Sequence, residues 1–171
     1  ISSFNQIQQL NTILLSTLSP IHISFSIHTH DRFTIKLILS HPSLNPTNLF
    51  NLFITQSNLS IQFIQQKQNH YLLLIKHSHL LFFIICIPTT HKLLPFTTLF
   101  ESSSNTFITA LKLYANHNHF TITNQSLINN TTQSIIPIHH IHDIFNSLSL
   151  IPPNSYQTIS DIIPITHSQS S

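Results

Sequence analysis

The chain has 171 residues, enough for one domain with a hydrophobic core, and 41% of them are hydrophobic, which is ordinary for a globular protein. Charged residues make up only 6% of it, against about 25% in a typical domain, and the formal net charge is +2. The absence of glycine excludes the Walker and Rossmann phosphate loops, and four carboxylates leave little for general acid–base catalysis.

The first forty residues predict a helix followed by a β-hairpin. Apolar residues recur at helical spacing over 4–18, and Pro20 follows them. Two runs then alternate between apolar and polar side chains, and Asp31 supplies turn chemistry between them. We expect one face of this antiparallel hairpin to lie on the core: Ile21, Ile23, Phe25, Ile27, Phe33, Ile35, Leu37 and Leu39.

The middle of the chain predicts a short helix and three strands. Asn45-Pro46 is typical of a helix start, with Asn as the cap and Pro at the first helical position. Strand-like runs follow at 59–65, 70–76 and 79–87. The last run is apolar on both faces, which predicts a central strand covered on both sides by helices or by a partner chain.

The last third predicts a helix over 105–116 with Asn116 as its left-handed C-cap, two weak strands at 119–123 and 126–129, and a helix over 138–149. The expected fold class is α+β, a mostly antiparallel sheet with several packed helices in a single domain over 1–150. A weak division is possible near 101–104, and 151–171 is expected to be an extended polar C-terminal tail.

Histidine offers the candidate metal ligands. His139, His142 and Asp143 would share one side of a helix, a spacing that could hold zinc with a further ligand from elsewhere. A solvated helix face is the favoured interpretation, and His28, His30 and Asp31 are interpreted in the same way, as a polar strand end. We therefore expect no cofactor and no catalytic site.

The composition indicates a guanine-poor coding strand. Valine is absent together with glycine, methionine and tryptophan, and every amino acid whose codons require guanine is rare. Protein stability gives no reason to separate valine from isoleucine. Such strand asymmetry is typical of a mitochondrial genome, and the lack of methionine beside abundant isoleucine favours a code in which AUA specifies isoleucine.

The function expected from these observations is that of a non-catalytic structural subunit of a large organellar assembly. A divergent, mitochondrially encoded ribosomal protein comes first, a peripheral subunit of a respiratory complex or ATP synthase second, and a histidine–metal enzyme third. No apolar run approaches the roughly 20 residues of a transmembrane helix. Ribosomal RNA is the expected nucleic-acid partner, and its candidate contacts are the positively charged residues of the middle region: Arg32, Lys36, Lys67, Lys76, Lys92 and Lys112.

Overall fold

A computed structural model describes residues 4–165 of the chain. The chain divides into two compact units between His91 and Lys92. Each unit combines helices with antiparallel strands, so the predicted α+β class is confirmed.

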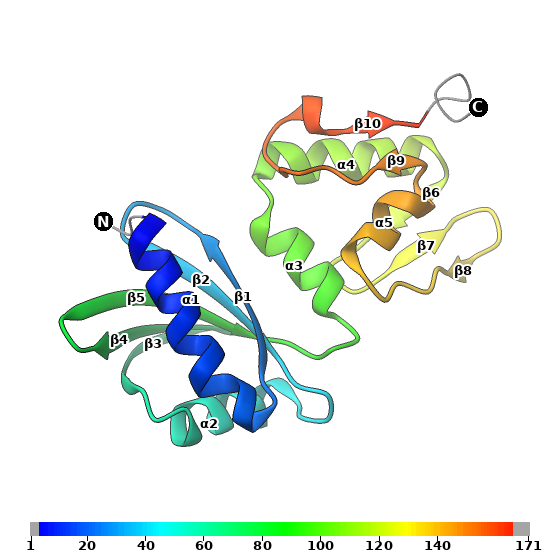
Figure 1. The fold of residues 1–171 in the computed structure, drawn as a ribbon. Helices are drawn as coiled ribbons and strands as arrows, with labels where there is room; N and C mark the ends of the chain where they lie inside the picture. The colour runs from blue at the N-terminus through cyan, green and yellow to red at the C-terminus, as the bar shows by residue number, and fades with distance from the viewer. Residues whose placement is uncertain (1–3, 166–171) are drawn as a thin grey trace. The chain divides into compact units, whose positions relative to one another are not determined.

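The first unit is a five-stranded sheet with two helices on one face (Figure 1). The helices are α1 (Phe4–Leu18), which continues into the 3-10 turn η1 (Ser19–Ile21), and α2 (Pro46–Gln56). The strands are β1 (Ser24–Thr29), β2 (Thr34–Ser40), β3 (Ser60–Lys67), β4 (His70–His77) and β5 (Leu80–Pro88). Their order across the sheet is β1-β2-β5-β4-β3, and only β2 and β5 run parallel.

The core of this unit lies between the helices and one face of the sheet. Its helical side comes from Leu10, Leu14 and Leu18 on α1 and from Leu49 and Phe53 on α2, all fully buried. The strands contribute alternate residues, as a half-covered sheet requires. Those that are fully buried in this core are Ile35, Leu37, Leu39, Leu73, Ile75, Ile84 and Cys86.

The predicted hairpin is confirmed from Ser24 onward, with corrections at its start and at its turn. Ile21 lies in η1 and Ile23 precedes β1, although both pack on the core as expected. Phe25 pairs with Leu39 and Ile27 with Leu37, so the expected apolar parity holds. Phe33, however, is 60% exposed, and the prediction that it faces the core is wrong. Asp31 Oδ1 accepts hydrogen bonds from the backbone N–H groups of Phe33 and Thr34, both at 2.8 Å, so Phe33 belongs to the turn rather than to β2.

The start of α2 follows the sequence signal. Asn45 Oδ1 accepts a hydrogen bond of 2.8 Å from the N–H of Asn48, and Pro46 occupies the first helical position. One turn later the ring of Phe50 stacks on Tyr71 of β4, with centroids 3.7 Å apart. The cap and the stacked rings fix the helix against the sheet.

In its described residues, 92–165, the second unit has three helices and two small sheets. The helices are α3 (Leu94–Ser102), α4 (Asn105–His117) and α5 (Ile141–Ser147). The strands β6 (Phe120–Ile122), β7 (Leu127–Asn129) and β8 (Ser134–Ile135) form an antiparallel sheet, and β9 (Leu150–Ile151) pairs with β10 (Ile163–Pro164) after the 3-10 turn η2 (Ile159–Asp161). Its core is a separate cluster that includes Leu99, Phe107, Leu111, Leu127, Ile144 and Phe145.

One expectation for this unit, the C-cap at Asn116, needs correction. Asn116 lies inside α4, and the left-handed residue after the helix is His119, with φ 67°. Residues 101 and 102 end α3, and residues 103 and 104 join it to α4 within the unit, whereas the chain divides after His91. Of the expected tail over 151–171, the described part, to residue 165, contains the 3-10 turn η2 and the β9–β10 pair, and Tyr156 stacks on Phe145 with ring centroids 5.7 Å apart. Residues 166–171 lie outside the described residues.

Candidate partner-binding face of the first unit

The face of the five-stranded sheet opposite α1 and α2 carries its own apolar side chains. Strand pairing places Leu72 beside Ile85 and Leu74 beside Phe83. Leu81 lies two residues before Phe83 on β5, so its side chain is on the same face. We call these five residues the open-face patch. Phe83 is 45% exposed and Leu81 is 55% exposed, whereas Leu72, Leu74 and Ile85 are half-buried. Farther along the same face Ile38 and Ile87 are buried.

This exposure qualifies the prediction made for run 79–87. The run does form the central strand, β5, between β2 and β4. The helices α1 and α2 cover only the face that carries Phe82, Ile84 and Cys86. Neither α1 nor α2 covers the other face of β5, which carries Leu81, Phe83 and Ile85.

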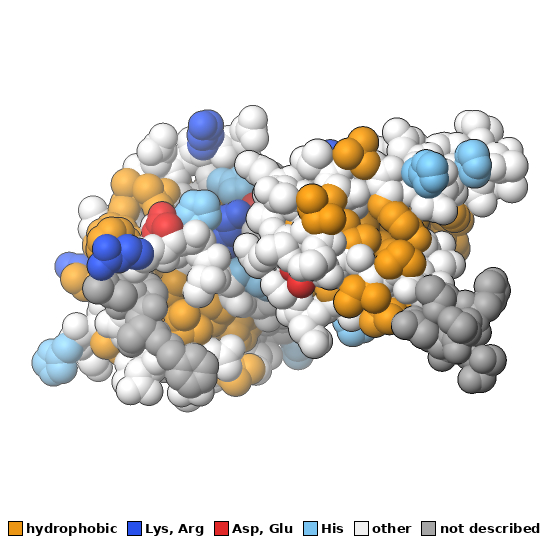
Figure 2. Space-filling model, turned by 90° about the horizontal axis from the view of Figure 1, so that it is seen from above, with side chains coloured by type: hydrophobic (Ala, Val, Ile, Leu, Met, Phe, Trp, Pro, Cys, Tyr) orange, Lys and Arg blue, Asp and Glu red, His pale blue; other side chains and the backbone are white. Residues whose placement is uncertain are grey.

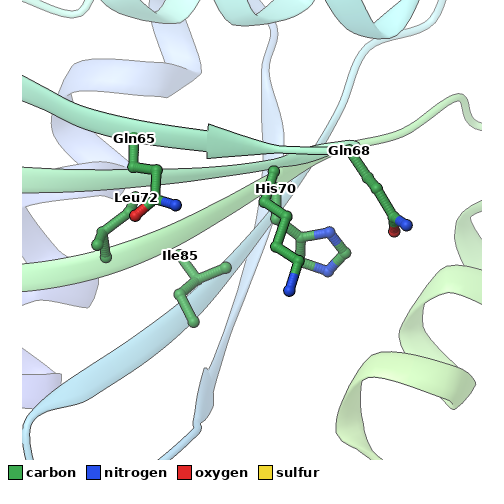
Figure 3. Close-up of a pocket in the computed structure, with 6 residues that line it drawn as sticks. Gln65, Gln68, His70, Leu72 and Ile85 are labelled. Carbon is green, nitrogen blue, oxygen red and sulfur yellow. The ribbon is translucent and has the colours of Figure 1, made fainter.

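A hollow of about 380 Å³ lies at one end of the patch. Gln65 on β3, Leu72 on β4 and Ile85 on β5 form its floor, and their side chains extend from the same side of the sheet (Figure 3). Its remaining lining residues lie at the turn between β3 and β4 and at the strand ends that flank it: Lys67, Gln68 and His70. The hollow therefore combines an apolar base with amide, imidazole and ammonium groups.

Three of the predicted RNA-contact residues come together on this face. Lys36 on β2 is the register partner of Ile85, Lys76 on β4 that of Leu81, and Lys67 on β3 lies beside His70. The five strands contain no Asp or Glu. The five strands therefore contribute only positive charge to the open face, around an apolar centre.

The other predicted RNA-contact residues lie elsewhere. Arg32 is in the β1–β2 turn, where its guanidinium carbon lies 5.6 Å from the centroid of the Phe33 ring. Lys112 lies on α4 of the second unit, with its ammonium 5.1 Å from the centroid of Phe100. Lys92 is exposed just before α3. The structure does not place these three on the open face.

His28 occupies the β1 edge of the open face. It is the register partner of Lys36, and its Nε2 lies 3.0 Å from Ser26 Oγ. Burial, and secondarily the positive charge of Lys36, lowers the pKa of His28 below its usual range. The imidazole is thus neutral at neutral pH, so Lys36 supplies the positive charge at this edge.

The candidate zinc ligands serve instead to begin α5. Asp143 Oδ2 accepts hydrogen bonds of 3.0 Å from the N–H groups of His139 and His140, and His140 Nδ1 accepts one of 3.1 Å from the N–H of His142. This is a capping box with histidine as its N-cap. These backbone hydrogen bonds lower the pKa of Asp143. Within residues 4–165, no three His, Cys, Asp or Glu side chains are close enough to hold a metal ion.

A second exposed apolar group lies on the second unit. Ile151, Ile163 and Ile165 are each at least 40% exposed around the β9–β10 pair, and Ile159, between the two strands, is exposed as well. Figure 2 shows hydrophobic side chains gathered on this unit, with few charged ones among them. No Lys or Arg follows Lys112 in the sequence, so the segment that carries this group contributes no positive charge of its own.

The sequence could have revealed the open-face patch through one signal. The run 79–87 is apolar at successive positions, which indicates that both faces need cover. None of the helices described by the structure is long and apolar enough to cross a membrane. No protein-family model matches this chain, and no curated protein matches its sequence.

Proposed function

We propose that this chain is a non-catalytic structural subunit of a large organellar assembly, with a mitochondrially encoded ribosomal protein as the first candidate. The observation that carries the proposal is the open-face patch, which exposes Leu81 and Phe83 at the centre of a sheet. Exposed apolar surface of this kind marks an interaction site. A surface with few charges protects poorly against nonspecific association, and a permanent partner removes that problem.

The positive border of the patch favours the ribosomal candidate. Lys36, Lys67 and Lys76 lie on one face without a carboxylate on the same five strands. Such a field attracts phosphate groups as well as acidic proteins. The guanine-poor composition supports an organellar gene.

Sedimentation of the native chain tests the ribosomal candidate. We expect the protein to travel with the mitochondrial ribosome and to shift when nuclease digests the RNA. Replacing Lys36 by Gln should reduce the salt dependence of binding to the ribosomal particle. The slope of log affinity against log salt concentration should become smaller in magnitude by about one, the value for a single phosphate contact. The same measurement on Lys112→Gln tests whether the second unit also contacts RNA.

A peripheral subunit of a respiratory complex or ATP synthase is the second candidate. The aliphatic character of Leu72, Leu74 and Leu81 favours it, because such side chains suit a protein neighbour. Detergent extraction that carries the chain into a respiratory complex, with no response to nuclease, would establish this candidate and exclude the first.

A further inference from the structure

We infer that the open-face patch is a docking site for one amphipathic, acidic helix of a neighbouring protein. The inference rests on the proposed function, because it names the kind of subunit that covers this face in the assembly. It holds for either candidate assembly. Its argument depends on the shape, the side-chain chemistry and the charges of the face.

The side chains of the patch favour protein over nucleic acid. Four of its five residues are leucine or isoleucine, and only Phe83 offers a ring. Proteins that bind single-stranded RNA on a sheet stack successive bases on several aromatic side chains. Aliphatic side chains instead pack against the apolar stripe of a helix, as the opposite face of this sheet does against α1 and α2.

The dimensions of the patch match a short helical stripe. From Leu81 to Ile85 the strand advances about 13 Å at 3.3 Å per residue. A helix covers that distance in about nine residues, so apolar side chains at i, i+3 or i+4, and i+7 would lie along it. One helix of two to three turns therefore covers Leu81, Phe83 and Ile85 along β5 and Leu72 and Leu74 beside them.

The charges specify an acidic partner. Lys76 lies level with Leu81 at one end of the patch, and Lys67 lies beside His70 beyond Ile85 at the other end. His70 and Lys76 are six residues apart on β4, about 20 Å. Asp or Glu residues near both ends of the docked helix would reach these two ammonium groups. The hollow lined by Lys67, Gln65 and His70 can receive one acidic side chain.

Binding of synthetic helices to the full chain tests this inference. The probe is a hydrocarbon-stapled 18-residue helix with a leucine stripe and Glu near both ends, and its matched control carries Lys in place of each Glu. Fluorescence anisotropy should show the Glu helix binding at least about tenfold more tightly, since two ion pairs are replaced by two repulsions. Phe83→Ser and the double variant Lys67→Gln/Lys76→Gln should each weaken binding of the Glu helix.

Phe33→Ser is the control variant, because Phe33 is a similarly exposed phenylalanine in the β1–β2 turn, outside the patch. It should leave binding unchanged. Equal affinity for the Glu and Lys helices, or undiminished binding by Phe83→Ser that is folded by circular dichroism, would overturn the inference. So would displacement of the Glu helix by a twelve-nucleotide oligouridylate, which would assign the face to RNA.

Cross-linking in the native particle separates this inference from the proposed function. A carbodiimide, which joins amines to carboxylates at zero length, should couple Lys67 or Lys76 to Asp or Glu of a helical segment in another subunit. A chain that sediments outside any large particle yet binds the Glu helix would refute the proposed function alone. A chain that sediments within a particle yet forms no such cross-link would refute the docking site alone.

Discussion

At the residue scale, His28 makes the first unit sensitive to mild acid. Burial and the charge of Lys36 lower its pKa in the folded chain below the ordinary value of 6.5. Below about that pH the unfolded chain takes up a proton that the folded chain does not, so stability falls as the pH falls. His28→Gln should lessen the loss between pH 7.5 and pH 5.5 in urea unfolding, whereas replacement of the exposed His22 should not. An equal loss in His28→Gln would show that other groups cause it.

The lack of glycine leaves residues with side chains in left-handed turn positions. Ser78, in the turn between β4 and β5, has φ 55°, a conformation that is unfavourable for residues with a Cβ. Ser78→Gly should therefore raise the free energy of unfolding by up to about 1 kcal/mol. The contrasting change is Ser16→Gly, at an exposed position in α1, which should lower it by about as much. Both values can be measured by denaturant unfolding, and a loss at Ser78 would contradict the argument.

At the scale of the element, two adjacent phenylalanines of β5 lie on opposite faces of the sheet. Phe82 is 2% exposed in the core beneath the helices, whereas Phe83 is 45% exposed on the open face. Phe82→Ala should lower the free energy of unfolding by about 3–5 kcal/mol, because it leaves a cavity. Phe83→Ala should cost much less stability but reduce self-association of the isolated chain, as measured by sedimentation velocity. Equal losses of stability would mean that both faces of β5 are covered.

The elements that the sequence predicted best are those whose signals are local. The alternation around Phe25 and Leu37 determines which face is buried, and Asn45 identifies the start of α2 through its own hydrogen bond. Phe33 misled because its apolar side chain continues the alternation, while Asp31 commits its backbone to the turn. The histidines beside Asp143 could have indicated a metal site, but in the structure His140 and Asp143 cap the start of α5.

Nonlocal features could not be read in the same way. The parallel pairing of β2 with β5 depends on how distant segments meet, and no sequence period records it. Helix α3 was not predicted, since its Pro95 and clustered Phe and Thr residues give no clear amphipathic period. The open-face patch was implied by the run that became β5, but the positions of Lys67 and Lys76 around it depend on the register of β3 and β4. The candidate site is thus a property of strand order.

At the scale of the whole molecule, each unit has its own core, and stability should divide accordingly. The first cluster includes Leu37 and the second includes Phe107, both fully buried, and among the described residues neither cluster contains a residue of the other unit. Leu37→Ala should lower the free energy of unfolding of the first unit by about 2–5 kcal/mol, and Phe107→Ala that of the second unit by about 3–5 kcal/mol. Because local stability follows the packing of each cooperative unit, each change should accelerate amide hydrogen exchange in its own unit.

Hydrogen exchange read by mass spectrometry distinguishes this division from a single cooperative molecule. We expect Leu37→Ala to speed exchange in β2, β4 and β5 while α4 and α5 keep their protection, and Phe107→Ala to do the reverse. Leu113→Ala is the control on α4, because Leu113 is 65% exposed and its removal leaves no cavity. Loss of protection in both units from one core substitution would show that the two clusters unfold together. If each substitution speeds exchange only in its own unit, the two units unfold independently. A partner that binds the open face would then stabilise the first unit against unfolding and leave the stability of the second unit unchanged, because a ligand stabilises only the unit whose unfolding releases it.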